Sequence, residues 1–119
     1  MGFELVAQDG RTISIAADEW LPTVELLARE GLLEPLKVAL AHYNACTAVT
    51  GDEARRIAAF LDGYLATVPP EGRVLLDGSV ITGTPARNGG GPTGGYAVPV
   101  ERLAHFRDFC RSSGGFLVE

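Results

Sequence analysis

The sequence predicts an α+β fold in a single small domain, spanning residues 1–119. A chain of 119 residues has the usual length of one domain. The expected strands and helices do not alternate regularly: two strands come first, three helices follow, and a helix and a strand close the chain. Regular alternation would favour a doubly wound parallel sheet. This order instead favours three to four helices packed on a small, mainly antiparallel sheet.

The first expected element is an N-terminal β-hairpin. Two apolar, partly alternating runs, residues 3–8 and 12–16, flank the dipeptide Asp9-Gly10. Asp-Gly between two such runs is typical of a tight hairpin turn, because glycine readily adopts positive φ angles. The alternation places one set of apolar side chains on a common face, namely Phe3, Leu5, Ala7, Ile13 and Ile15.

Two helices are expected after the hairpin, and proline marks the start of each. Pro22 suits the first turn of a helix, where its missing N–H costs no hydrogen bond. That helix is expected to run to about Glu30. Pro35 opens a shorter helix that is expected to reach about Tyr43.

The third expected helix has the clearest start. Thr50 and Glu53 have the spacing of a capping box, in which each side chain accepts a hydrogen bond from the other residue's backbone N–H. Apolar residues then recur at helical spacing, and Pro69-Pro70 ends the pattern. They are Ala54, Ile57, Ala58, Leu61 and Leu65.

The last third of the chain is expected to hold short strands, a loop and a closing helix. Residues 73–76 and 80–82 have the composition of short strands, separated by a turn. Residues 83–95 are rich in glycine and carry no apolar pattern, so they predict a flexible loop. A helix over residues 99–112 follows, and residues 116–118 are expected to form an edge or closing strand.

Charge is distributed unevenly and argues for a protein partner. The net charge is −5, and residues 1–36 carry 7 acidic and 2 basic residues, whereas residues 37–119 carry 8 of each. Nucleic acid is not expected to bind, because its phosphates need a basic patch. A membrane is not expected either, because no apolar run approaches the roughly 18 residues of a span. The acidic third predicts a basic protein partner, with Glu19, Trp20, Glu25 and Glu30 as candidate contacts.

Trp20, the single tryptophan, has two interpretations. Large aromatic side chains are usually highly buried, so Trp20 is expected to pack the start of a helix against the hairpin. If it were exposed, it would be an aromatic anchor within an acidic rim.

The two histidines and two cysteines are candidates for a metal site or, as a thiol with a histidine base, for a catalytic nucleophile. His42, Cys46, His105 and Cys110 could supply four zinc ligands. His105 and Cys110 are five residues apart, however, which turns their side chains about 140° apart on a helix. No signature of a catalytic thiol surrounds either cysteine. The preferred interpretation is therefore that no metal or other cofactor is bound and that the cysteines are small buried apolar residues.

The glycine-rich loop gives the main alternative function. Its backbone N–H groups, with Arg73, Arg87 and Tyr96, could surround a phosphate or another small anion. The chain lacks both the Gly-Lys-Ser/Thr ending of a phosphate-binding loop and the dinucleotide-binding glycine pattern, so this signal is weak.

The sequence therefore favours a non-enzymatic protein-binding domain with an acidic N-terminal face. An immunity or antitoxin protein would fit, because masking a basic surface requires acidic complementarity on a stable scaffold. The alternatives are a small-molecule or anion-binding protein or enzyme that uses residues 83–95, and a structural homodimer. Two cysteines and the lack of a secretory signal pattern predict a cytoplasmic location.

Overall fold

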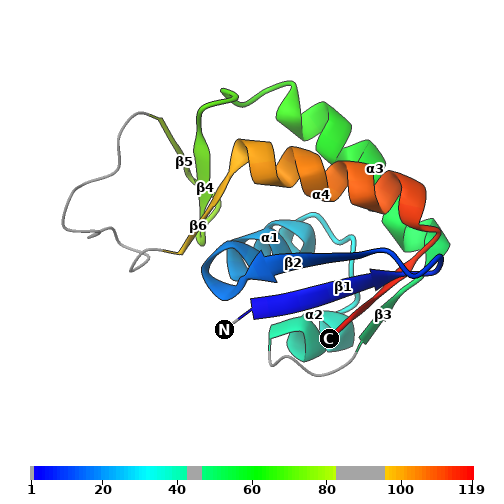
Figure 1. The fold of residues 1–119 in the computed structure, drawn as a ribbon. Coiled ribbons are helices and arrows are strands. Elements are labelled where there is room, and N and C mark those ends of the chain that lie inside the picture. Colours follow the sequence, from blue (N-terminus) through cyan, green and yellow to red (C-terminus); the bar gives the residue numbers. More distant parts are fainter. Residues whose placement is uncertain (1, 43–46, 83–95) are drawn as a thin grey trace.

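The computed structural model describes residues 2–42, 47–82 and 96–119. Figure 1 shows how the helices and strands within these residues are arranged. None of the described helices is long and apolar enough to span a bilayer. The elements are β1 (Gly2–Ala7), β2 (Thr12–Ala16), α1 (Ala17–Arg29), α2 (Pro35–His42), β3 (Thr47–Val49), α3 (Gly51–Leu65), β4 (Arg73–Leu75), β5 (Val80–Ile81), β6 (Ala97–Pro99), α4 (Val100–Ser113) and β7 (Phe116–Val118).

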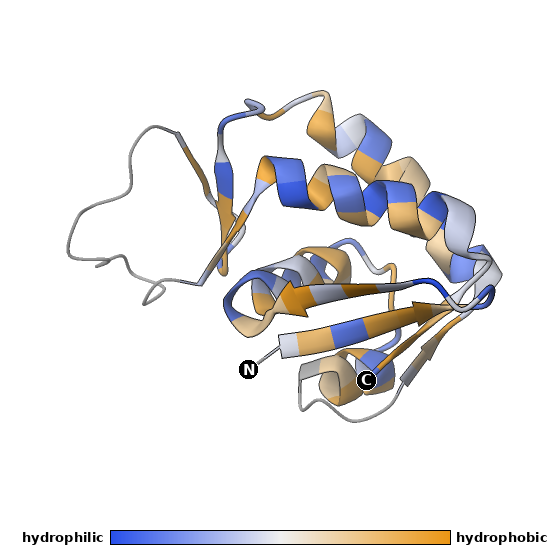
Figure 2. Ribbon diagram, in the orientation of Figure 1, coloured by the Kyte–Doolittle hydropathy of each residue, from blue (hydrophilic) through white to orange (hydrophobic). Residues whose placement is uncertain are grey.

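The α+β class is confirmed, but the described strands form two sheets instead of one. Sheet A has the order β2-β1-β7-β3 and sheet B the order β5-β4-β6, and every pairing in them is antiparallel. Helix α1 packs on β1, β2 and β6, and α4 packs along α3. Figure 2 shows hydrophobic and hydrophilic stripes alternating along α3 and α4, as expected for helices with one buried side.

The N-terminal hairpin forms as predicted. Phe3 pairs with Ile15 and Leu5 with Ile13, so these apolar side chains share the face that meets the helices. Gly10 has a φ of 93°, which a residue with a side chain rarely adopts.

Helix α1 begins five residues before the predicted start. Its first residue is Ala17, directly after β2, and Pro22 lies inside the helix, where it is buried. Two acidic residues in the first turn, Asp18 and Glu19, interact favourably with the positive end of the helix dipole. Pro22 leaves the carbonyl of Asp18 without its helical partner, a cost that the burial of this helix face offsets.

Three short strands depart from the prediction. Strands β3 and β6 have no counterpart in the prediction. Residues 116–118, predicted as an edge or closing strand, form β7, which lies between β1 and β3 and not at an edge. Phe116 of β7 pairs with Ala7 on one side and with Val49 on the other. A strand of three residues is too short to show a periodic pattern, and its pairing depends on residues far away in the sequence.

Helix α3 starts with the predicted capping box, and a lysine strengthens it. The Glu53 backbone N–H donates to Thr50 Oγ1 over 3.1 Å, and the Thr50 N–H donates to Glu53 Oε1 over 2.9 Å. Lys37 Nζ of α2 donates to the same Glu53 Oε1 over 2.6 Å. Glu53 is buried, so this group links α2 to the start of α3 inside the protein.

The core is centred on a row of aromatic rings. Trp20 is 2% exposed and lies 5.8 Å from Phe3 and 5.9 Å from Phe106, measured between ring centroids. Phe106 in turn meets the edge of Phe116 at 6.1 Å. The indole N–H of Trp20 donates to the carbonyl of Ala41 over 3.3 Å. The row therefore ties α1 to β1, β7, α2 and α4.

Candidate functional site

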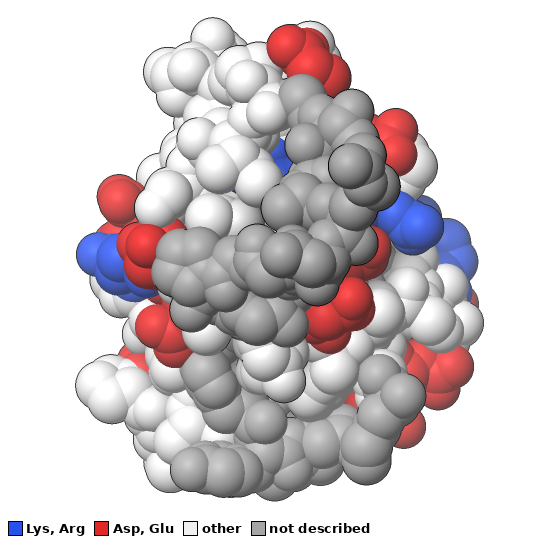
Figure 3. Space-filling model, turned by 90° about the vertical axis from the view of Figure 1, so that its left-hand side faces the viewer, with Lys and Arg blue, Asp and Glu red and all other residues white. Residues whose placement is uncertain are grey.

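The three acidic residues predicted to contact a partner lie along α1 or at its C-terminal end. Glu19 and Glu30 lie at opposite ends of α1, separated by roughly 16 Å of helix rise. Glu25 is partly buried between them. Trp20 is buried, so its interpretation as an exposed anchor is wrong and the core interpretation is correct. On the face in Figure 3, acidic groups likewise lie at several separate places.

The four candidate zinc ligands do not assemble within the part that the structure describes. Cys110 is buried and His105 is exposed, although both lie on α4. Cys46 and the side chain of His42 lie outside the described residues. Among residues 2–42, 47–82 and 96–119, no three His, Cys, Asp or Glu side chains gather closely enough to hold a metal ion.

Cys110 has the environment of a structural thiol. Its side chain is fully buried, and burial raises the pKa of the thiol well above its ordinary value of 9.0. In a Cys46→Ser variant, we therefore expect iodoacetamide at neutral pH to leave the folded protein unmodified, because the thiolate is the reactive form. Intact mass spectrometry checks this, with a urea-denatured sample as the control. Alkylation of the folded chain at the rate of the denatured one would show that Cys110 is accessible and ionised.

The predicted anion site is not brought together in the described residues. Arg73 of β4 pairs with Pro99 of β6, whereas Tyr96 precedes Ala97, which pairs with Leu75. Arg73 and Tyr96 therefore lie at opposite ends of this strand pair. Arg87 and the loop at 83–95 lie outside the described residues.

The exposed backbone of β2 is a feature that the sequence reasoning missed. The Ala7 N–H donates to the carbonyl of Arg11 over 2.8 Å, which makes this pair hydrogen-bonded. Hydrogen-bonded pairs alternate along an antiparallel ladder, so Ile13 and Ile15 also bond to β1. Thr12, Ser14 and Ala16 must then point their N–H and C=O groups away from β1. Of the described strands, only β1 pairs with β2, so these groups form an open edge.

This edge lacks the usual protection against further pairing. Residues 12–16 contain no charged residue and no proline, and their ladder with β1 has no bulge. Three of the five are β-branched, which favours an extended conformation. A short, unprotected edge of this kind is able to accept another strand.

The outer face of sheet A, away from the helices, is acidic beside this edge. The backbones of Glu4 and Glu119 exchange two hydrogen bonds, of 2.9 Å and 2.8 Å, so the two residues stand directly opposite each other. Both are exposed, and Glu4 also pairs with Ser14 of β2. The other described strand residues on this face bring no basic side chain; they are Gly2, Val6, Thr12, Ala16, Ala48 and Leu117. The repulsion between the two carboxylates is therefore not offset on this face.

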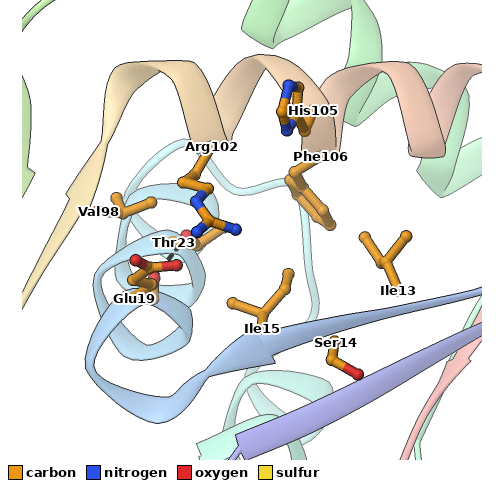
Figure 4. Close-up of a pocket in the computed structure, with 9 residues that line it drawn as sticks. All are labelled: Ile13, Ser14, Ile15, Glu19, Thr23, Val98, Arg102, His105 and Phe106. Atoms are coloured by element: carbon orange, nitrogen blue, oxygen red, sulfur yellow. Dashed lines mark hydrogen bonds between the residues drawn. The ribbon is translucent and has the colours of Figure 1, made fainter.

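A cavity of about 170 Å³ lies between β2, α1, β6 and α4 (Figure 4). Its apolar lining comes from Ile13, Ile15, Val98 and Phe106, and its polar lining from Glu19, Thr23, Arg102 and His105. Ser14 also lines it, but Figure 4 shows the Ser14 side chain pointing away, so the backbone of β2 faces the cavity.

Two opposite charges at one end of the cavity are not paired. Figure 4 shows the guanidinium of Arg102, from α4, and the carboxylate of Glu19, from α1, turned toward each other. Within the described part of the chain, neither group forms an ion pair or a side-chain hydrogen bond. The Thr23 hydroxyl donates to the backbone carbonyl of Glu19 over 2.8 Å and fixes this turn of α1.

Comparison of the chain with protein-family models, with curated proteins and with solved structures found no match. The features of the molecule that bear on function are therefore the edge of β2, the acidic outer face and the cavity.

Proposed function

We propose that this protein is a non-enzymatic protein-binding domain that adds an extended segment of its partner to β2. The open edge at Thr12, Ser14 and Ala16 is the observation that carries this proposal. Backbone hydrogen bonds supply affinity in strand addition, and the side chains of alternate residues supply specificity.

The charge of the outer face supports a basic segment as the partner. A residue that pairs with Ser14 would place its side chain on the outer face, in the same cross-strand row as Glu4 and separated from it by Ser14. Lysine or arginine there would reach the Glu4 carboxylate and reduce its repulsion with Glu119. The expectation of a basic partner from the sequence is kept, but its contact residues become Glu4 and Glu119.

Ser14→Pro tests the proposal. Proline removes the N–H that points outward but not one that bonds to β1, so the hairpin is expected to tolerate it. Ser14→Thr is the matched control, because it keeps the N–H. The probe is a displayed library of random twelve-residue peptides, selected on the wild-type protein and then measured by fluorescence anisotropy. We expect selected peptides to be rich in lysine or arginine and to lose about tenfold or more in affinity with Ser14→Pro.

Two controls complete the experiment. Raising the salt concentration from about 50 to 300 mM should weaken binding, because the attraction to Glu4 and Glu119 is screened. Failure to select any peptide, or selected peptides that bind Ser14→Pro as tightly as wild type, would refute strand addition. Sedimentation of the protein without peptide tests whether β2 pairs with a second copy of this chain. If the wild-type protein is a dimer and Ser14→Pro is a monomer, the segment that binds β2 belongs to a second copy.

A further inference from the structure

The cavity between β2 and α4 has the size of one side chain. Its volume is about 170 Å³. A dry cavity of about 150 Å³ admits a benzene ring, so this one accommodates a branched or aromatic side chain. The buried ring of Phe106 and the half-buried Ile13 and Ile15 provide an apolar surface for it.

The two charged residues at the end of the cavity determine which charged groups a ligand in it must have. Glu19 and Arg102 face each other there without forming an ion pair. A guanidinium binds a carboxylate with two parallel hydrogen bonds, and a carboxylate accepts hydrogen bonds from an ammonium group. A ligand that bridges the two therefore carries both an ammonium and a carboxylate, close together and next to an apolar group.

We propose that the cavity binds a free apolar α-amino acid of the size of leucine or phenylalanine. Its carboxylate bonds to Arg102, and its ammonium bonds to Glu19. Thr23 lies next to Glu19, and its hydroxyl oxygen has lone pairs left to accept from the same ammonium. The side chain of the ligand contacts Ile13, Ile15 and Phe106. This site goes beyond partner binding at β2, and its failure would leave that proposal unaffected.

The direct test is a titration of the ¹⁵N-labelled protein with L-leucine, followed by NMR chemical shifts. Three comparators each remove one feature: 3-methylbutylamine lacks the carboxylate, 4-methylpentanoate lacks the ammonium, and glycine lacks the apolar side chain. We expect shifts at Ile15, Glu19 and Arg102 with leucine, and affinities about tenfold or more lower for every comparator.

Variants of the two charged residues complete the test. Glu19→Gln and Arg102→Gln should each weaken leucine binding about tenfold or more, and neither should disturb folding because both side chains reach solvent. Glu30→Gln and Arg56→Gln, which alter exposed charges outside the cavity, are the matched controls and should bind like wild type. The proposal is overturned if leucine does not bind at about 10 mM. It is also overturned if a comparator binds equally well, or if the cavity variants behave like the controls.

Discussion

Replacing Trp20 with alanine is expected to lower the free energy of unfolding by about 3–5 kcal/mol. The indole is 2% exposed and contacts the rings of Phe3 and Phe106, so truncation leaves a large cavity in the core. It also leaves the carbonyl of Ala41 without its donor. Domains of this size are stable by only about 5–15 kcal/mol, so the variant should be close to unfolding at room temperature.

Urea unfolding followed by far-ultraviolet circular dichroism measures this loss, since the variant has no tryptophan fluorescence. Trp20→Phe is the matched control, because it keeps a ring between Phe3 and Phe106 and should recover a large part of the stability. A Trp20→Ala variant within about 1 kcal/mol of wild type would contradict the central position given to this residue.

Acid is expected to destabilise the protein through Glu53. Burial alone would raise the pKa of this carboxyl, but the hydrogen bonds from Lys37 and from the Thr50 N–H, with the charge of Lys37, outweigh it and hold the pKa below its ordinary 4.5. The unfolded chain therefore takes up the proton at higher pH than the folded one. The stability that Glu53 contributes is complete above about pH 4.5 and is lost as the pH falls through the lower, folded pKa.

Glu53→Gln provides the test. It should lower the free energy of unfolding at pH 7 by about 1–4 kcal/mol, because Lys37 keeps its charge in a partly buried place without its partner. Below pH 4.5 the gap between variant and wild type should narrow. Asp52→Asn is the control, because Asp52 is a neighbouring carboxylate that is 80% exposed and pairs only at the surface with Arg55. Equal pH dependence in wild type and Glu53→Gln would exclude this role for Glu53.

Local signals in the sequence were sufficient for the elements that short segments determine. Asp9-Gly10 located the hairpin and Thr50 with Glu53 located the start of α3, because a turn and a helix cap each depend on a few adjacent residues. Pro22 was misleading because the sequence does not show that burial of α1 outweighs a missing hydrogen bond.

The candidate site was predictable only in part. Two residues that line the cavity were named from the sequence, but with other roles: Glu19 as a contact for a basic partner and His105 as a zinc ligand. Arg102 has no local sequence signal that marks it as a site residue. The cavity joins two consecutive elements near the N-terminus, β2 and α1, with two consecutive elements near the C-terminus, β6 and α4, and their arrangement depends on the whole fold. The uncharged run at residues 12–16 was a usable signal for an open edge. The same run would also suit a central strand, and only the position of β2 at the edge of sheet A distinguishes the two.

The central position of β7 has a consequence for biosynthesis. Ribosomes release the N-terminal residues first, so the β1–β2 hairpin and β3 are complete long before residues 116–118 emerge. Because β7 lies between β1 and β3, the strand that links β1 to β3 is missing until residues 116–118 have emerged. During translation one side of β1, and the side of β3 that β7 later occupies, therefore stay open to wrong partners. Sheet A is complete only when β7 has paired with β1 and β3, and the β1–β7 pairing closes the longest loop among the described strand pairs.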